Sequence, residues 1–350
     1  MSDVRNRLIR CLRDPRDTGP WPDDLLASAR ANRVHLLLAD RAAIDPLQSD
    51  LRAAIALEAA RERELRHVLA ALAGVGVQPV LLKGVVLSRT HYPRPELRPR
   101  TDTDLIIPAS SRGATARALI ELGYEQVAEV DGSLTTGQFH LHKHDAVGLF
   151  HALDVHCRIS NVQAFAHVLS YAELVTDARP LPSLGPHAWG PSPVHALMIA
   201  CVHLVAHHGN SDSLLWLMDV SLLARSLERH ERDCFAELTA LRGIRAVCWS
   251  TLKLADSAFG GIDTEWLASL PTETIEPTAA FLQGPMRQID ILKQDLLASP
   301  RLWHRLQIVG EHLFPSSAFM YTRYGTRRTF KLPFLYAHRI VTGMPKWFRR

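Results

Sequence analysis

Two aspartates lie two residues apart in the stretch RPRTDTDLIIP, which spans residues 98–108. Asp102 and Asp104 precede a short apolar run that ends at Pro108, a pattern typical of a strand. Residues two apart on a strand point to the same face, so we expect the two carboxylates to project together, roughly 7 Å apart at the backbone. Paired carboxylates of this kind suit a hard divalent cation such as Mg²⁺.

A third acid, Asp154, lies in FHALDVHCRIS, which also has the pattern of a strand. If the two strands are neighbours, Asp154 completes a cluster of three carboxylates. Three carboxylates around two cations about 4 Å apart are the usual apparatus of in-line phosphoryl or nucleotidyl transfer. A DxD alone also occurs in turns as solvated acids or helix caps. The basic segment before this one, and the LLKG strand and turn upstream, favour the metal site.

Three motifs resemble those of the family labelled uncharacterised nucleotidyltransferase, within the DNA polymerase β-like nucleotidyltransferase superfamily. LLKGVVLSRTHY is similar to the family's LLKG turn and tyrosine, RPRTDTDLIIP to its RPxxDIDLL strand, and ALDVHCRIS to its later DLHWR strand. HALMIACVHLVAHHGNSDSLLWLMDVSLL and FPSSAFMYTRYG resemble its helical and C-terminal parts. The positions that fall on the core motifs are Lys83, Gly84, Tyr92, Arg98, Pro99, Asp102, Asp104, Asp154, His156 and Arg158.

The resemblance implies a metal-dependent nucleotidyltransferase that moves a nucleoside monophosphate from a nucleoside triphosphate to a hydroxyl acceptor. One Mg²⁺ or Mn²⁺, held by Asp102 and Asp104, would orient the β- and γ-phosphates, and a second, shared with Asp154, would bring the hydroxyl to the α-phosphorus. Asp154 would accept the hydroxyl proton. The motifs do not encode the acceptor: a small molecule, a sugar, a modified peptide, a protein side chain and RNA all stay open. The positions expected to bind nucleotide are Lys83, Gly84, Arg98, His156 and Arg158.

The first turn departs from the broader superfamily, which carries a Gly-Ser pair that holds the nucleotide phosphates. This chain has Lys83 and Gly84 there, and we expect Lys83 to act as a point charge on phosphate instead. Arg98 has two alternative roles: it neutralises the leaving pyrophosphate, or it pairs with Asp102. The departure also leaves open a catalytically inactive nucleotide- or partner-binding module with the same fold. The three carboxylates argue against that alternative.

The 18 histidines raise a weaker hypothesis, a histidine-based metal hydrolase. His140, His142 and His144 alternate along one segment, so a strand would place three imidazoles on one face, where they would suit zinc. We prefer an edge strand that turns them to water. His203 and His207 are four apart and share a helix face; lining the cleft, or hydrogen bonding within a helix bundle, is the simpler interpretation.

Two further features involve charge. Asp219 lies in the very apolar helix LLWLMDVSLL, where a carboxylate needs a partner, and we expect a buried pair with an arginine or histidine from a neighbouring helix rather than a substrate contact. The chain ends in the basic, aromatic stretch YTRYGTRRTFKLPFLYAHRIVTGMPKWFRR. It would suit an acidic partner, nucleic acid or a membrane surface. A packed helix with a basic end is commoner, so we expect no membrane partner and do not favour nucleic acid.

The composition is that of an ordinary globular protein. The 350 residues are 47% hydrophobic and 22% charged, and the net charge of +4 does not demand nucleic acid. The start, MSDVRNRLIRCLRD, has no apolar segment typical of a secretory signal, and ALMIACVHLVA is too short to span a membrane. The five scattered cysteines form no CxxC pair. They suit a reducing compartment, so we expect a cytoplasmic protein.

The order of elements predicts how these residues are positioned. Helical periodicity covers DDLLASARANRVHLLLADRAA and residues 46–76, short strands and helices alternate from VQPVLLKG to VGLFHALDVHCRI, and helix returns after about residue 160. We predict an α+β fold, a small mixed sheet flanked by helical segments. The expected parts are an N-terminal helical segment (1–76), the nucleotidyltransferase-like core (77–160) and a C-terminal helical domain (161–350). The proline-rich ARPLPSLGPHAWGPSP is the expected linker.

Overall fold

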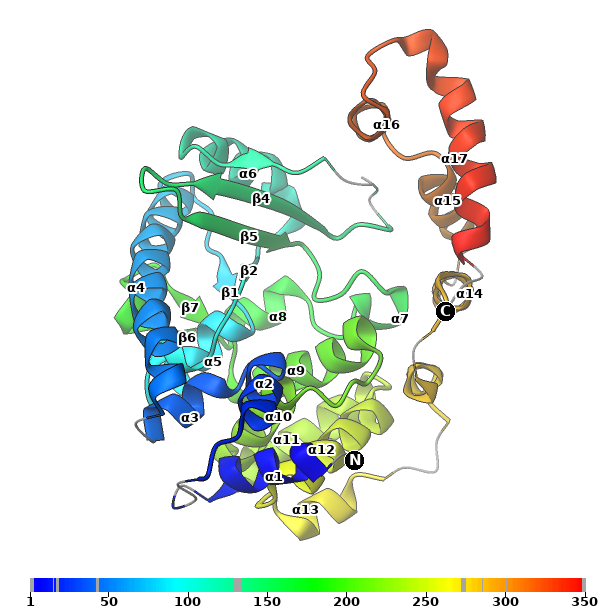
Figure 1. Cartoon of the computed structure of the whole chain (residues 1–350). Helices are drawn as coiled ribbons and strands as arrows, with labels where there is room; N and C mark the ends of the chain where they lie inside the picture. The colour runs from blue at the N-terminus through cyan, green and yellow to red at the C-terminus, as the bar shows by residue number, and fades with distance from the viewer. Residues whose placement is uncertain are drawn as a thin grey trace.

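The computed structural model describes residues 3–347 except 15, 17, 18, 42, 43, 129–131, 133, 272–274, 285 and 300. The predicted α+β class is confirmed: a five-stranded mixed sheet lies among helices (Figure 1). The strands of this sheet are β1 (Val80–Leu81), β2 (Thr103–Ile106), β3 (Glu125–Gln126), β4 (Gln138–His144) and β5 (Phe150–His156). The helices are α1 (Asp3–Arg13), α2 (Asp23–Ala31), α3 (His35–Arg41), α4 (Asp45–Gly74), α5 (Gly84–Thr90), α6 (Arg112–Glu121), α7 (Gln163–Ala166), α8 (Tyr171–Thr176), α9 (Pro193–His208), α10 (Leu214–Ser226), α11 (Arg229–Leu241), α12 (Arg245–Phe259), α13 (Thr264–Ser269), α14 (Gln288–Ala298), α15 (Leu302–Leu313), α16 (Ser317–Tyr324) and α17 (Leu332–Trp347).

The strand order across the sheet is β1-β2-β5-β4-β3. β2 and β5 are parallel, while β1 with β2, β4 with β5 and β3 with β4 pair antiparallel. In the β2–β5 register Asp104 lies opposite Asp154, and Ile106 lies opposite His156. Residues directly opposite each other share a face of the sheet. The two acids predicted on neighbouring strands are therefore brought together by the backbone itself.

The sheet buries one face against α4 and α6, which lie beside it in Figure 1. Leu105, Leu153 and Val155 join the apolar side chains of these helices in one hydrophobic cluster. Because side chains alternate along a strand, the residues between them point the other way. We call this second face the site face; it carries Asp104, Gln138, His140, Asp154 and His156.

Helices that precede the sheet in sequence share a second hydrophobic core with helices that follow it. Leu25 of α2 and Leu37 of α3 belong to the same cluster as Leu204 of α9 and Leu217 of α10. In Figure 1 α1 and α2 lie beside α10 and α12, although they are far apart in sequence. Ile106 on the site face also belongs to this cluster. The helices before and after the sheet thus pack as one layer opposite the site face.

The periodic segment at 23–43 forms two helices rather than one; its last two residues lie outside the described part of the chain. α2 ends at Ala31, Arg33 has a left-handed φ of 58°, and α3 begins at His35. Asn32 secures the break, since its Nδ2 donates to the Ser28 carbonyl oxygen (2.9 Å). Apolar residues on both sides of the break are buried in one core, so the apolar periodicity gave no sign of it.

The proline-rich stretch expected as a linker is an ordered part of the fold. β6 (Arg179–Pro180) and β7 (Trp189–Gly190) pair antiparallel. Leu181 and Leu184 between them are buried in the same cluster as the sheet. These leucines explain why the segment packs against the protein despite its prolines.

The last helices, α14 to α17, form a lobe to one side of the sheet (Figure 1). Within it Arg339 donates to the His312 carbonyl oxygen (2.8 Å), which ties α17 to α15. Glu311 of α15 accepts a hydrogen bond from the backbone N–H of Thr135 (2.8 Å), which ties the lobe to the segment before β4. The basic stretch spans the end of α16, a 3-10 turn (Thr329–Lys331) and α17 as far as Trp347; the residues after it are outside the description. In the described ranges, no helix combines the length and the apolar character needed to cross a membrane.

Candidate active site

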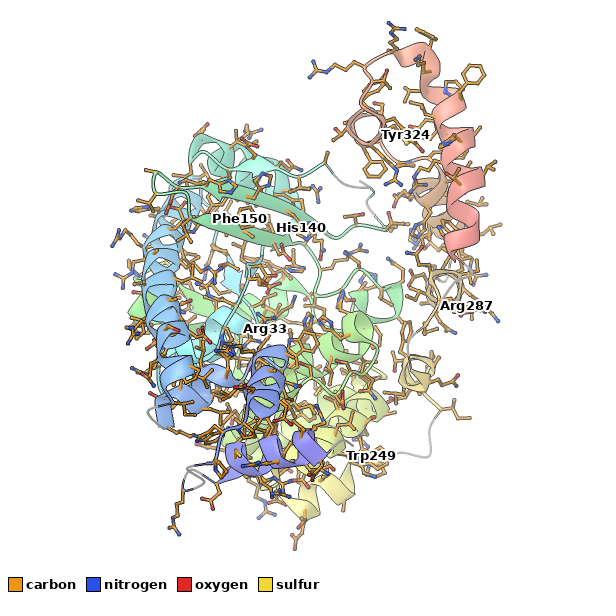
Figure 2. The ribbon with its side chains drawn as sticks, in the orientation of Figure 1. Arg33, His140, Phe150, Trp249, Arg287 and Tyr324 are labelled. Atoms are coloured by element: carbon orange, nitrogen blue, oxygen red, sulfur yellow. The ribbon has the colours of Figure 1, made fainter. Side chains whose placement is uncertain are left out.

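The site face and helices α9 and α10 enclose a cavity of about 340 Å³. Three acids and His156 line it on the sheet side, Asp219 and the ring side chains of α9 and α10 line it on the helix side, and four cations reach it from loops and turns. The polar and aromatic lining residues are Arg33, Lys83, Arg98, Arg100, Asp102, Asp104, Gln138, Asp154, His156, His203, His207, His208, Trp216 and Asp219. Figure 2 shows His140 on the sheet and Arg33 at the end of α2.

Two of the three predicted carboxylates converge. Asp104 Oδ1 accepts hydrogen bonds from Lys83 Nζ (2.6 Å) and His156 Nε2 (2.9 Å). Asp154 Oδ1 lies 3.4 Å from His140 Nε2. Asp104, Asp154 and His156 each offer one possible metal-ligand atom, and the three atoms lie within 4.8 Å of one another. The histidine two residues after Asp154 thus joins the acids, as expected from its place on the same face.

Asp102 lines the same cavity but does not belong to this group of three. Burial raises the pKa of Asp102, and the charges of Asp104 and Asp154 raise it further. Asp104 behaves in the opposite way. Burial alone would raise its pKa, but the Lys83 ammonium and the hydrogen bond from His156 outweigh burial and hold the pKa well below its usual range. Asp104 is therefore ionised at any physiological pH.

The LLKG turn places Lys83 and makes room for Arg98. The Leu82 N–H donates to the Asp104 carbonyl oxygen (3.0 Å), which fixes the turn to β2. Lys83 has a left-handed φ of 53°, an unusual conformation for a residue with a side chain. A Cβ at position 84 would lie 2.4 Å from Arg98 Nη1. Glycine at position 84 is thus required by the arginine that packs on it.

Arg98 pairs with Asp219 rather than with Asp102. Its Nη2 lies 2.5 Å from Asp219 Oδ2, and the Tyr92 hydroxyl donates to Asp219 Oδ1 (2.8 Å). The exposed fractions are 7% for Arg98 and 3% for Asp219. The expectation that Asp219 has a buried arginine or histidine partner is confirmed, but the arginine comes from the segment before β2 and not from a neighbouring helix. The tyrosine and the arginine of the core motifs thus anchor the sheet side of the cavity to α10.

Arg158, expected to bind nucleotide, does not line the cavity among the described residues. Its Nη2 donates to the Leu134 carbonyl oxygen (2.9 Å). The reason is that β5 ends at His156, so the strand alternation that would have placed Arg158 on the site face no longer applies. Arg158 therefore lies apart from the cavity, and its part in nucleotide binding stays a prediction.

The three alternating histidines are not on an edge strand. β4 lies between β5 and β3, so the preferred interpretation was wrong about strand position. The His140 imidazole lies against Asp154, and His142 Nε2 lies 3.7 Å from Glu125 Oε2. His144 packs against the Phe150 ring, with centroids 5.1 Å apart. Within the described residues these histidines form no metal-binding group with one another.

The histidines of α9 line the cavity, as expected for His203 and His207, and His208 joins them. The His208 ring stacks on Trp216 with centroids 3.6 Å apart, and its Nε2 lies 3.0 Å from His203 Nε2. Burial, and then the charge of Lys83, lowers the pKa of His208 to about 4 and that of His203 well below its ordinary value. This wall is therefore uncharged at neutral pH.

Several lining residues escaped prediction. Arg33 lies in a segment without a motif, and Arg100 occupies a variable position of the RPxxDIDLL pattern, so neither was marked as functional. His208 and Trp216 lie in the helical segment that resembles the family, and only their place in a polar, aromatic part of that segment would have suggested a role. His208 and Trp216 line the cavity because α9 and α10 pack opposite the site face.

The site and fold define a nucleotidyltransferase-like α+β protein. Its features are paired acids on adjacent parallel strands, a lysine on the preceding turn and a cation-lined cavity. Residues 21–260 match the model of the family described as uncharacterised nucleotidyltransferase. The chain belongs to that family, as the motifs predicted. No curated protein matches it. The family match includes α2 to α4 before the sheet, the sheet itself and helices α9 to α12; α1 and the C-terminal lobe lie outside it.

Proposed function

We propose that the protein is a metal-dependent nucleotidyltransferase that transfers a nucleoside monophosphate from a nucleoside triphosphate to a hydroxyl acceptor. The observation that carries the proposal is the pairing of Asp104 with Asp154 across two parallel strands, at the wall of the cavity. Membership of the family supports nucleotide transfer in general. The metal, the catalytic roles and the hydroxyl acceptor are the parts that we add.

The donor set fits a divalent cation. Asp104, Asp154 and His156 offer two oxygens and one nitrogen within 4.8 Å. Asp102 adds a third carboxylate that lines the same cavity. The one positive charge of Lys83, which pairs with Asp104, is fewer than the negative charges of the carboxylates. Carboxylates suit Mg²⁺, and Mn²⁺ also accepts an imidazole. A bound cation would neutralise charge that develops on the phosphoryl oxygens.

The side chains of the chain itself supply the remaining roles. Asp154 would accept the proton of the acceptor hydroxyl, and the adjacent His140 imidazole would hold its carboxylate in place. Lys83 keeps Asp104 ionised and is close enough to the cavity to contact phosphate as a point charge. The stacked rings of His208 and Trp216 offer an uncharged flat surface, which suits a nucleobase.

The test is incubation of the purified protein with each labelled nucleoside triphosphate, MgCl₂ and a cell extract, with measurement of pyrophosphate release and mass analysis of the labelled product. We expect release that requires Mg²⁺ or Mn²⁺ and that EDTA abolishes. Asp104→Asn and Asp154→Asn should each lower the rate by roughly 10²–10⁴-fold. Asp233→Asn, a change at an exposed carboxylate on α11, is the matched control and should keep full activity. Transfer that survives both site substitutions would rule out this mechanism.

One observation favours a second candidate, the inactive nucleotide- or partner-binding module. The Lys83 ammonium already lies 2.6 Å from Asp104 Oδ1, so a cation must share this carboxylate with it. Metal-dependent nucleotide binding with no pyrophosphate release from any triphosphate would identify this module. Pyrophosphate release would exclude it.

A further inference from the structure

Four cationic side chains line the cavity, and three of them already have a carboxylate partner. The three pairs are Lys83 with Asp104, Arg98 with Asp219, and Arg100 with Glu58. A cation whose charge is matched by a neighbouring acid has less attraction left for a ligand. The fourth cation, Arg33, differs from them.

Arg33 is the cavity cation without an acid of its own. Its Nη2 donates to the Pro99 carbonyl oxygen (3.1 Å), and it forms no ion pair with any residue in the described part of the chain. Burial lowers the pKa of Arg33, and the positive charge of Arg98 lowers it further. A guanidinium that is partly buried near another cation is stabilised by an anion in the cavity.

The backbone at Arg33 adds an independent observation. Its φ of 58° lies in the left-handed region, which glycine adopts freely and a residue with a Cβ adopts at a cost. The position closes the turn after α2, where the Arg33 N–H donates to the Arg30 carbonyl oxygen (2.9 Å). Glycine is the usual residue at such a helix end. The arginine side chain thus stands where backbone stability favours glycine, and strain of this kind at a cavity wall points to a function.

We infer that Arg33 binds the polyphosphate of the nucleoside triphosphate, and that the N-terminal helices thereby contribute a residue to the site. The nature of this ligand rests on the proposed function. The guanidinium presents several N–H donors in a rigid fork that matches phosphate oxygens. Its hydrogen bond to Pro99 fixes it to the segment that leads into Asp102 and β2. Arg33 therefore contacts the anion from the turn that follows α2.

The experiment is titration calorimetry with inorganic tripolyphosphate in the presence of MgCl₂, because this probe carries the phosphates without a base. Arg33→Gly should weaken binding by at least about tenfold, the loss expected for charge-assisted hydrogen bonds. The tripolyphosphate affinity of Arg33→Lys should lie between those of the wild type and Arg33→Gly, since an ammonium keeps the charge but lacks the forked N–H donors of a guanidinium. Arg30→Gln is the matched control, because Arg30 is exposed and pairs with Asp50, and it should bind as the wild type does.

A second measurement separates binding from structure. Removing a structural arginine lowers the Tm, whereas Arg33→Gly relieves the left-handed backbone and should keep the Tm of the wild type or raise it. Any of three results would overturn the inference. They are an unchanged affinity of Arg33→Gly for tripolyphosphate, no binding of tripolyphosphate by the wild type, and a fall in Tm that accompanies the loss of binding. Tripolyphosphate binding that depends on Arg33, with no nucleotide transfer from any triphosphate, would support the inference and refute catalysis.

Discussion

Asp219 offers a test of how the cavity is held together. Its carboxylate accepts hydrogen bonds from Arg98 Nη2 (2.5 Å) and Nε (3.3 Å) and from the Tyr92 hydroxyl (2.8 Å). Asp219→Asn keeps the shape of the side chain and an oxygen acceptor but removes the charge. Burial by itself would lower the pKa of Arg98, and the charge of Asp219 raises it instead. The guanidinium remains protonated in the variant because its pKa is far above neutrality in any case.

The magnitude follows from the burial of both partners. Removing one partner of a buried ion pair leaves an uncompensated charge and costs about 3–5 kcal/mol. Arg98 and Asp219 are 7% and 3% exposed, so little solvent is present to screen the remaining charge. The neutral hydrogen bond from Tyr92 to the amide oxygen persists, so we expect a loss at the lower end of this range, about 3 kcal/mol.

The assay is urea unfolding followed by circular dichroism at pH 7.5. The control is Asp50→Asn, since Asp50 and Arg30 form a partly exposed ion pair (2.9 Å), whose loss should cost less than about 1 kcal/mol. The double variant Arg98→Met with Asp219→Asn removes the stranded charge and should recover part of the loss. The reasoning about the buried pair is wrong if Asp219→Asn lowers the free energy of unfolding no more than Asp50→Asn does. It is also wrong if adding Arg98→Met to Asp219→Asn lowers the free energy of unfolding further.

Two further predictions use the same unfolding assay. Gly84→Ala places a Cβ 2.4 Å from the present position of Arg98 Nη1 and should cost about 1–3 kcal/mol, and wild-type stability would contradict the close packing. Burial raises the pKa of Asp295 to about 6, above the value of about 3.9 in an unfolded chain, so the folded state binds this proton more tightly and stability falls as pH rises from about 4 to about 6. Asp295→Asn keeps an acceptor for the Gln163 N–H. The variant should be more stable than the wild type by about 2 kcal/mol at pH 7.5 and equal to it below about pH 4. Equal stability of the two proteins at both pH values would contradict the raised pKa.

The local patterns of the core were readable because each has a local physical cause. The alternation around Asp104 and Asp154 predicted two strands, and the polar side chains interrupting apolar runs indicated a face turned to a site. The glycine of the LLKG motif indicated the turn at the end of the first strand. That the two strands are neighbours came from the family resemblance, since strand pairing depends on contacts between distant segments.

The residues that were missed or misplaced depend on such distant contacts. Arg33 sits in a break that apolar periodicity hides, because α2 and α3 bury their leucines in the same core. Arg158 was misplaced because no proline or glycine marks the end of β5 at His156. His140 was assigned to an edge strand because alternation along a strand carries no information about which strands flank it.

The parallel register of β2 and β5 has a consequence for how the site forms during folding. The chain between these strands contains α6, β3 and β4, so the β2–β5 pairing joins segments far apart in sequence, and contacts of this long-range kind form late. A slip of one residue would turn Asp154 toward the side where Leu153 is now buried and leave Asp104 opposite a leucine. In a refolding time course, pairing of the two acids would therefore follow helix formation, and molecules trapped in the shifted pairing would be compact and helical but would lack the Asp104–Asp154 pair.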